Sequence, residues 1–426
     1  MKILVVGGGG REHALCWKLS SSSLVDKLYC APGNAGIERC AECVPIDAEN
    51  VEKIVRFAVE QSVEMVLVGP EAPLMAGLSD ILREKKIKVF GPTKSAAEIE
   101  GSKAFSKDLM KVANIPTSSY KVFEDRDKAW KHIKKTGTPI VVKADGLAAG
   151  KGVIICTSLE EASNALDLIM VKKEFGDAGR RVLVEGFLEG EEASFIALTD
   201  SHTVAPLASA QDHKAIFDND KGPNTGGMGA YSPAPIVTPA VNEKIMEKVM
   251  LPIVKAMEKM KRPYLGVLYA GLMIKNGAPS VLEFNARFGD PETQPQMARM
   301  KSDLAEAMLA TIEGRLKDYK LEWDPRPAVC VVMASGGYPG KYEKGKPIEG
   351  IEDAEKLRDV VVFHAGTKKD GTRVVTNGGR VLGVTALGAD IQSAISRAYE
   401  AVAKIHWDGV LYRKDIGAKA LVKPNK

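Results

Sequence analysis

No long apolar run occurs in this 426-residue sequence. The N-terminus, MKILVVGGGG, meets glycine before it reaches the roughly 7–15 apolar residues of a secretory signal peptide. Nowhere does the chain approach the about 18–20 apolar residues that a membrane-spanning helix requires. We therefore expect a protein with no membrane partner and a cytoplasmic location.

The sequence also has little excess charge. Lys and Arg together number 59 against 55 Asp and Glu, which leaves a formal charge of +4. Basic runs such as REKKIK and KHIKK alternate with apolar residues, which is typical of solvated helix faces. Because a nucleic-acid binder clusters its basic charge on one surface, we expect no nucleic-acid partner.

Cysteine is scarce and scattered. There are six cysteines, and only Cys40 and Cys43 form a C-x-x-C pair. No second Cys or His pair lies at zinc-site spacing, and a reducing compartment keeps thiols unpaired. The composition therefore argues against a disulfide scaffold, a zinc site and a redox pair.

What the sequence does contain, over its first 100 or so residues, is an alternation of short apolar strands and amphipathic helices. We expect strands at KILVVG, KLYCAP, EMVLVGP and KVFGP, with helices at REHALCWKL, VEKIVRFAVEQ and LSDILREKK between them. Such alternation predicts a parallel sheet with helices on both faces. Ligands bind beyond the carboxyl ends of such strands, where loops 7–13, 31–36 and 69–74 lie.

The glycine run of the first loop resembles a dinucleotide fingerprint but departs from it. His13 stands where the third glycine of G-x-G-x-x-G belongs, and no acid ends the second strand to hold a ribose hydroxyl. We expect instead that Gly9, Gly10 and Arg11 bind one phosphate group at a helix N-terminus, with Glu71 accepting sugar hydroxyls. The alternative is a tight turn that needs glycine for packing.

A second glycine-rich loop, residues 146–152 (GLAAGKG), joins two apolar strands. It differs from a Walker A loop because one residue too few separates its glycines and Gly152 replaces the magnesium-binding Ser or Thr. The residues that follow are β-branched, so we expect a strand there and no helix. The loop predicts a mobile flap whose amides cover phosphates, with Lys143 adding charge; a plain hairpin turn is the alternative.

The segment RVLVEGFLEGEEASFIAL predicts a strand, a hinge and another strand. Glu185 can accept a hydrogen bond from the exocyclic amine of a base, hinge backbone groups can meet the base edge, and Glu192 can accept hydrogen bonds from ribose hydroxyls. Acids beside a hinge are also common without any nucleotide. Combined with the flap, however, this segment predicts a nucleotide clamp.

Polar residues end the apolar strand of VLEFNARFGDPETQP. The strand period of two predicts a polar face formed by Glu283, Asn285 and Arg287, and a core face formed by Leu282, Phe284 and Ala286. Carboxylate and amide oxygens suit magnesium, which completes its shell with phosphate and water. An arginine beside that metal suits an anionic substrate or a transferring phosphoryl group. We expect Asp290 and Glu292 to orient the following loop.

The chain from about residue 326 onward changes character again. The strand AVCVVMAS, glycine-rich turns, further short strands and the amphipathic helix DIQSAISRAYEAVAKI predict an α+β cap. No clear catalytic cluster occurs there. We expect this part to be structural and to close the cleft between the first domain and the nucleotide clamp.

Together these segments resemble known enzymes. KADGLAAGKG, VEGFLEGEEASF and EFN are similar to ATP-grasp ligases, while GGGGREHAL, GPEAPL, QDHK, GPNTGGMGAYSP and RFGDPETQ resemble the phosphoribosylamine–glycine ligase family over essentially the whole chain. The resemblance implies an α/β and α+β multidomain protein. Its parts would be an N-terminal parallel-sheet (pre-ATP-grasp) domain at 1–101, an ATP-grasp domain at 102–325 with a flap-bearing subdomain at about 120–188, and a C-terminal α+β domain at 326–426.

The resemblance also implies a reaction. ATP would phosphorylate glycine, and 5-phosphoribosylamine would attack the glycyl phosphate, giving glycinamide ribonucleotide, ADP and phosphate in the second step of purine synthesis. The implied cofactors are ATP and Mg²⁺ or Mn²⁺. The implied partners are these small molecules and, transiently, the preceding pathway enzyme, with the chain a monomer or dimer. Two alternatives stay open: an ATP-grasp ligase of a different acid and amine, and a non-catalytic nucleotide or sugar-phosphate sensor.

Family roles carry over to matching positions of this sequence. The resemblance implies that the metal binds Glu283 and Asn285. It implies that ATP binds Lys103, Lys143, Gly146, Gly150, Lys151, Gly152, Glu185, Phe187, Leu188 and Glu192. Substrates would contact Gly9, Gly10, Arg11, Glu71, Thr225, Gly226, Gly227, Met228, Gly229 and Arg287. Catalysis would fall to Arg287, Lys214, His213 and Asp212.

Three points about these roles differ from the family or stay open. Ala215 stands where many family members have arginine, so a phosphate contact from that side chain is excluded here. The strand LYAGLMI beside EFN offers no carboxylate, unlike that of many ATP-grasp enzymes. His213 is either a proton acceptor for the attacking amine or a residue that orders its loop.

Overall fold

The computed structural model describes residues 1–148 and 151–422. Its N-terminal part is a five-stranded parallel sheet in the order β3-β2-β1-β4-β5. The strands are β1 (Lys2–Gly7), β2 (Lys27–Pro32), β3 (Glu42–Cys43), β4 (Met65–Val68) and β5 (Lys88–Phe90). The helices are α1 (Gly10–Leu19), α2 (Val51–Glu60), α3 (Glu71–Met75), α4 (Leu78–Glu84) and α5 (Lys94–Gly101).

This sheet confirms the parallel fold predicted from alternation, with two local differences. The short strand β3 was not expected, because two residues carry too little periodicity to detect. The predicted loop 69–74 is also partly helical, since α3 begins at Glu71 directly after Pro70. Glu71 therefore projects from the first turn of a helix at the carboxyl end of β4.

The flap-bearing part is a four-stranded sheet in the order β6-β9-β7-β8. Its strands are β6 (Tyr120–Phe123), β7 (Ile140–Ala144), β8 (Val153–Cys156) and β9 (Val182–Gly186). Helix α6 (Lys103–Val112) precedes it, and α7 (Arg126–Thr136) and α8 (Leu159–Leu166) share its apolar core. Strands β7 and β8 pair antiparallel, so the predicted strand–loop–strand arrangement is confirmed.

A second four-stranded sheet, in the order β11-β10-β16-β17, forms the centre of the molecule. Its strands are β10 (Glu191–Asp200), β11 (Val204–Pro206), β16 (Leu265–Lys275) and β17 (Ala278–Asn285). Along β10, Ala193, Phe195 and Ala197 share a core with α9 (Pro239–Ile245) and α10 (Leu251–Lys259). Ile196 and Leu198 face the opposite core with α12 (Leu304–Ile312). Burial on both faces fixes this sheet beneath the site.

Strand β17 contains an irregularity that the sequence did not predict. Gly271 pairs with Glu283 and Leu272 pairs with Val281, so Leu282 is one extra residue in the ladder. Val281 and Phe284 belong to the buried core, while Leu282 is only half-buried, lines the cavity described below and is not part of that core. The expectation that Leu282 faces the core is therefore wrong, because a bulge shifts the alternation by one residue.

The C-terminal sheet runs in the order β12-β15-β18-β22-β19, and β23 pairs with β18. Its strands are β12 (Gln211–Asp212), β15 (Gly229–Ser232), β18 (Ala328–Ser335), β19 (Val360–His364), β22 (Arg380–Leu387) and β23 (Val410–Leu411). Helices α11 (Thr293–Arg299), α13 (Ile351–Glu355) and α14 (Ile391–Val402) accompany it. Two hairpins, β13 (Ala215–Phe217) with β14 (Lys221–Asn224) and β20 (Thr367–Asp370) with β21 (Arg373–Thr376), complete the strands.

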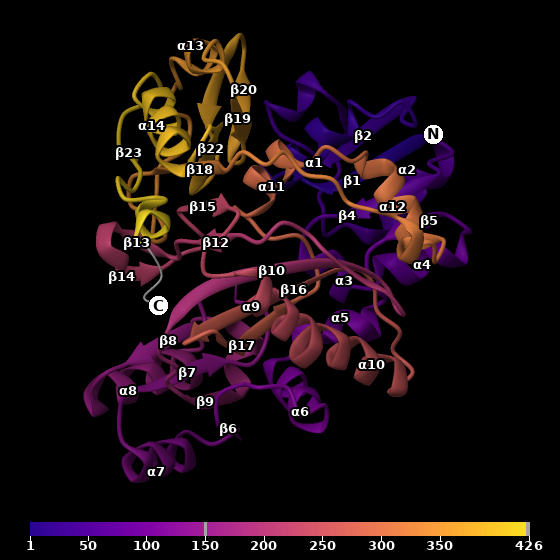
Figure 1. Ribbon diagram of the computed structural model, residues 1–426. Helices are drawn as coiled ribbons and strands as arrows, with labels where there is room; N and C mark the ends of the chain where they lie inside the picture. The colour runs from indigo at the N-terminus through magenta and orange to yellow at the C-terminus, as the bar shows by residue number, and fades with distance from the viewer. Residues whose placement is uncertain (149–150, 423–426) are drawn as a thin grey trace.

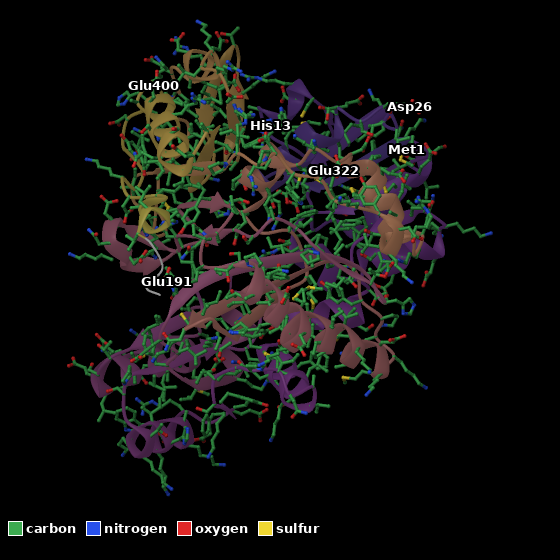
Figure 2. The ribbon with its side chains drawn as sticks, viewed as in Figure 1. Met1, His13, Asp26, Glu191, Glu322 and Glu400 are labelled. Carbon is green, nitrogen blue, oxygen red and sulfur yellow. The ribbon has the colours of Figure 1, made fainter. Side chains whose placement is uncertain are left out.

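This sheet joins segments from both sides of the predicted boundary at residue 326. Strands β12 and β15 come from the middle of the chain but pair, through β15 and β18, with the C-terminal strands. The N-terminal and C-terminal parts lie next to each other, and the flap-bearing sheet projects on the other side of the central sheet (Figure 1). His13 lies where the N-terminal and C-terminal parts meet (Figure 2). There its Nδ1 accepts a hydrogen bond from the His364 backbone at 2.7 Å. Among the described residues, no helix is both long and apolar enough to cross a membrane.

Candidate active site

A single cavity of about 390 Å³ brings together side chains from every part of the chain. The N-terminal part contributes Arg11 and Glu71, and the C-terminal part contributes Arg380. Between them lie residues of α6, the flap-bearing sheet, β17 and the 212–226 segment. The predicted cleft therefore lies where the sheets meet.

Glu283 and Asn285 both line this cavity, at the end of β17. Burial alone would raise the pKa of Glu283, but Lys214, Lys143 and Lys103 together lower it to about 2. An ionised carboxylate beside an amide oxygen fits a hard divalent cation that keeps water and phosphate ligands. Among residues 1–148 and 151–422, no group of three or more His, Cys, Asp or Glu side chains could hold a metal alone. Any metal here would therefore need phosphate or water ligands.

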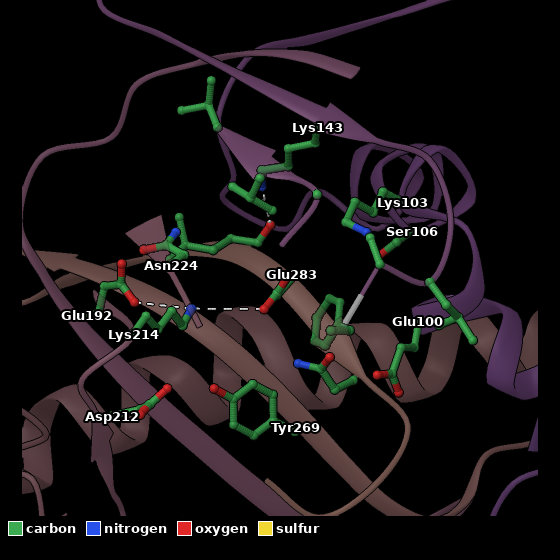
Figure 3. Close-up of a pocket in the computed structure, with 18 of the residues that line it drawn as sticks. Glu100, Lys103, Ser106, Lys143, Glu192, Asp212, Lys214, Asn224, Tyr269 and Glu283 are labelled. Atoms are coloured by element: carbon green, nitrogen blue, oxygen red, sulfur yellow. Dashed lines mark hydrogen bonds and ion pairs between the residues drawn. The ribbon is translucent and has the colours of Figure 1, made fainter. Parts of the chain in front are cut away.

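Lys214 lies between two carboxylates in the cavity (Figure 3). Its Nζ is 3.1 Å from Glu192 and 3.9 Å from Glu283. Burial alone would lower the pKa of Lys214, but these acids raise it well above its ordinary value. Lys214 therefore stays cationic next to the acid that suits a metal.

Two further lysines face the cavity from the flap side. Lys103 Nζ donates to the Gly146 carbonyl at 2.8 Å, and Lys143 Nζ donates to the Leu282 carbonyl at 3.1 Å. Lys151 instead donates to the Pro339 carbonyl at 2.9 Å and does not line the cavity. Gly146 and Gly152 line the cavity, whereas Gly150 lies outside the described residues. Two cations near an acid form a surface that suits phosphate groups.

The hinge lies at another end of the same cavity, which Glu185, Phe187, Leu188 and Glu192 all line. Burial alone would raise the pKa of Glu185, but Lys143 and Lys107 lower it. Its carboxylate is therefore an ionised acceptor beside an apolar slot. This arrangement matches what a base with an exocyclic amine requires.

The glycine loop of the N-terminal domain is less open than the sequence suggested. The Gly9 amide already donates to Glu12 Oε2 at 2.7 Å, and neither Gly9 nor Gly10 lines the cavity. A Cβ on Gly10 would lie 2.6 Å from Gln294 Nε2, so packing also requires glycine there. Arg11 does line the cavity, although its Nε donates to Glu12 Oε1 at 2.6 Å. The tight-turn alternative thus explains Gly10 in this structure.

Arg287 lies in the cavity between the acids of the N-terminal part and the end of β17. Its Nε is 3.3 Å from Glu71 Oε2, and its Nη2 is 3.1 Å from Glu100 Oε1. Burial alone would lower the pKa of Arg287, but Glu100 and Glu71 raise it. The guanidinium lines the cavity and is held in place by two acids.

The segments 211–214 and 224–229 divide between the cavity and the core. Asp212, Lys214, Thr225 and Gly226 line the cavity, whereas Gly227, Met228 and Gly229 do not. Burial raises the pKa of Asp212 well above its ordinary value, with Glu292 adding to the shift. Met228 instead packs in a small apolar cluster.

His213 points away from the cavity. It is 1% exposed, its Nδ1 is 3.2 Å from the Gly229 carbonyl, and its ring makes an edge contact with Tyr231. Burial lowers the pKa of His213 to about 4. This placement favours the loop-ordering role over proton transfer, and catalysis by His213 stays a prediction.

Sequence reasoning missed several residues that line the cavity, chiefly Glu100, Lys107 and Arg380. Arg380 Nη1 donates to the Gly226 carbonyl and, at 2.8 Å, to the Asp290 carbonyl. Its Nη2 is 3.1 Å from the Asp290 carboxylate. No motif marks these residues, because each reaches the site only through pairing of distant segments.

Comparisons with known proteins show which family the chain resembles. Three family models match: "Phosphoribosylglycinamide synthetase, N domain" at 1–100, "Phosphoribosylglycinamide synthetase, ATP-grasp (A) domain" at 101–293 and "Phosphoribosylglycinamide synthetase, C domain" at 328–419. Proteins named phosphoribosylamine–glycine ligase are similar as well. That of Vibrio parahaemolyticus is 51% identical over 99% of both chains, and that of Escherichia coli O157:H7 is 52% identical over 99% of both.

Solved structures give the same result. Phosphoribosylamine–glycine ligase from Thermotoga maritima superposes with a TM-score of 0.84 and 33% identity, covering 98% of this chain and all of the other. A biotin carboxylase from Campylobacter jejuni shares the fold alone, with a TM-score of 0.74 and 15% identity over 98% of this chain and 94% of its own.

Proposed function

This chain belongs to the phosphoribosylglycinamide synthetase family, and we propose that it joins glycine to 5-phosphoribosylamine at the expense of ATP. The observation that carries the proposal is one cavity that places Glu283 and Asn285 beside Lys103, Lys143 and the N-terminal side chains. A phosphate chain, a small acid and a sugar phosphate can meet there.

The chemistry needs charge neutralisation first. Glycine's carboxylate is ionised near neutral pH and resists amines because oxide is a poor leaving group. Transfer of the γ-phosphoryl group gives glycyl phosphate and ADP. The amine of 5-phosphoribosylamine then attacks the acyl carbon, phosphate leaves, and one proton leaves the nitrogen. The products are glycinamide ribonucleotide, ADP and phosphate.

The phosphoryl transfer would use the cations around Glu283. Glu283 and Asn285 would hold Mg²⁺ or Mn²⁺, which supplies charge neutralisation and orientation for the phosphates. Lys103 and Lys143 would bind the phosphate chain under the flap, and Lys214 would approach the γ-phosphate. Preorganised cations of this kind stabilise the charge that spreads over a transferring phosphoryl group.

The amide-forming step would use the opposite side of the cavity. Arg287 would bind the glycine or acyl-phosphate end, and Arg11 with Glu71 would bind phosphoribosylamine. Asp212 faces the cavity, and a carboxylate with a raised pKa suits acceptance of the proton from the amine. Thr225 and Gly226 would close over the reacting atoms.

The deciding experiment measures phosphate release with both substrates. We expect release that depends on glycine and on phosphoribosylamine together, with a product of the mass of glycinamide ribonucleotide. Turnover with another amino acid but not with glycine would favour the alternative ligase. Nucleotide binding without any ADP release would favour the sensor.

Three finer expectations stay predictions. Equal assays in Mg²⁺ and in Mn²⁺ would identify the preferred ion. Sedimentation analysis would distinguish monomer from dimer. Comparison of free and coupled supply of phosphoribosylamine would test contact with the preceding enzyme.

A further inference from the structure

The two oxygens of the Glu185 carboxylate have very different surroundings. Oε2 is 2.8 Å from Lys107 Nζ and 3.2 Å from Lys143 Nζ, and it accepts a hydrogen bond from Ser118 Oγ at 2.7 Å. Oε1 is buried and has no hydrogen-bond partner among the described residues. A buried carboxylate oxygen without a donor is unfavourable, so this atom can accept a hydrogen bond from an N–H or O–H group of a molecule in the cavity.

Lys107 is held at this carboxylate by more contacts than Lys143. It projects from α6 with a side chain only 2% exposed, and its ammonium lies 2.7 Å from Thr117 Oγ1, 3.0 Å from Ser118 Oγ and 2.8 Å from Glu185 Oε2. These three contacts match its three donors. Lys143 also binds the Leu282 carbonyl and faces the phosphate region, so a bound nucleotide can draw it away from Glu185.

The position of Oε1 indicates which kind of hydrogen-bond donor could reach it. Glu185 lines the cavity next to the hinge residues Phe187 and Leu188. A purine placed on this hinge with its C6 edge toward Glu185 would present its C6 substituent to the carboxylate. In adenine that substituent is an amine, which donates, whereas in guanine it is a carbonyl oxygen, which only accepts. An ionised Oε1 therefore attracts adenine and repels guanine.

We propose that Lys107 is a positioning residue that fixes Glu185 as an ionised acceptor and thereby sets the preference for adenine over guanine nucleotides. This inference rests on the proposed function in one respect, that a purine nucleotide occupies the hinge. Lys107 does not itself touch the base. Without the Lys107 ammonium, Oε2 of Glu185 loses its ion-pair partner from α6, and the carboxylate can rotate or take up a proton.

Electrostatics support this role. Burial raises the pKa of Glu185, and Lys143, Lys107 and the hydrogen bond from Ser118 lower it. Removal of one lysine therefore favours the protonated carboxyl group, whose O–H can donate to a guanine carbonyl. The expected defect is a loss of discrimination between adenine and guanine nucleotides, and not only a loss of affinity for adenine nucleotides.

The test is nucleotide binding by calorimetry, with MgADP and MgGDP and no other substrate. We expect the unaltered protein to bind MgADP at least about 100-fold more tightly than MgGDP, as sites with a committed polar partner do. Lys107→Met should lower this ratio at least tenfold, whereas Lys107→Arg, which keeps the charge, should lower it less. Lys111→Met, an exposed lysine one turn further along α6, is the matched control and should keep the full ratio.

A folded Lys107→Met protein with the full ADP-to-GDP ratio would overturn the proposal. If that variant does not fold, Ser118→Ala removes another donor to the same oxygen and should lower the ratio in the same direction; an unchanged ratio there would also overturn it. Because the readout needs neither glycine nor phosphoribosylamine, it separates this inference from the ligase reaction. If the unaltered protein did not join glycine to phosphoribosylamine but the ADP-to-GDP ratios changed as expected, only the proposed function would be contradicted.

Discussion

At the scale of single residues, three lysines surround the carboxylate of Glu283 in the cavity. Lys103, Lys143 and Lys214 all act on this one carboxylate and keep its pKa near 2. Each lysine also has a second partner, for example Glu185 for Lys143 and Glu192 for Lys214. Such a site is preorganised for a polyanion with its metal, because its lysines offer fixed positive charges to phosphates and its carboxylate suits the metal.

The first prediction concerns Glu283. Glu283→Gln should lower kcat about 100-fold or more, because the site loses the carboxylate that suits the metal at the phosphates. The fold should be retained, since the neighbouring lysines keep their other acids. ADP release in Mg²⁺ and thermal denaturation would measure the two effects, with the exposed Glu191→Gln on β10 as control. Wild-type turnover in Mg²⁺ would show that the metal assignment is wrong.

At the scale of elements, short strands decide which side chains reach the cavity. Across β12 and the two residues after it, Asp212 and Lys214 line the cavity while His213 is buried and does not. The following hairpin β13–β14 is held from the C-terminal segment by Arg413, which is buried. Arg413 donates to the Ala215 carbonyl at 3.0 Å and pairs with Asp220 and Asp415. The hairpin that follows Lys214 is thus fixed from a distant part of the chain.

The second prediction concerns Asp415. Burial alone would raise its pKa, but hydrogen bonds from Arg413 and the Asn219 backbone lower it from 3.8 to about 2. A lowered pKa in the folded state stabilises the fold above the unfolded pKa, and this stabilisation is lost as pH falls from about 4 toward 2. Asp415→Asn should therefore cost about 1–3 kcal/mol at pH 6 and make stability fall less steeply from pH 5 to pH 3.

Urea denaturation at each pH would measure this difference. The control is Asp408→Asn, because the carboxylate of Asp408 is exposed. This variant should keep the slope with which the free energy of unfolding of the unaltered protein changes with pH. Equal slopes for Asp415→Asn and the unaltered protein would contradict the role given to this ion pair.

At the scale of the whole molecule, the C-terminal sheet is part of the site and not only a cover. It contains β12, which includes Asp212 and ends two residues before Lys214, and β15, which pairs with β12. From β22, Arg380 reaches the backbone of Gly226 and both the backbone and the carboxylate of Asp290. One guanidinium therefore holds two loops that line the cavity.

The third prediction concerns this arginine. Arg380→Met should lower kcat/KM about 10- to 100-fold, because both loops lose their common partner and misplaced groups act poorly. Arg380→Lys should recover only part of the activity, since an ammonium cannot reproduce the planar fork. Steady-state kinetics with circular dichroism would measure both, and the exposed Arg373→Met in the same domain is the control. Unchanged kinetics for Arg380→Met would show that the C-terminal domain has a purely structural role.

The sequence by itself determined the features that depend on local order. Alternating apolar segments specify the parallel sheet, the β-branched residues after the flap specify a strand, and the period of β17 brings Glu283 and Asn285 to one cavity. These are properties of neighbouring residues, so a single chain read in order is enough to find them.

Only the tertiary structure decided the features that depend on distant pairing. The extra residue at Leu282 follows from the register of β17 on β16, and the burial of His213 follows from packing under Tyr231. The contacts of Lys107 with Glu185 and of Arg380 with Asp290 join residues far apart in the chain. Their physical cause is the meeting of separate sheets around one cavity, and nothing in the local pattern of either partner encodes it.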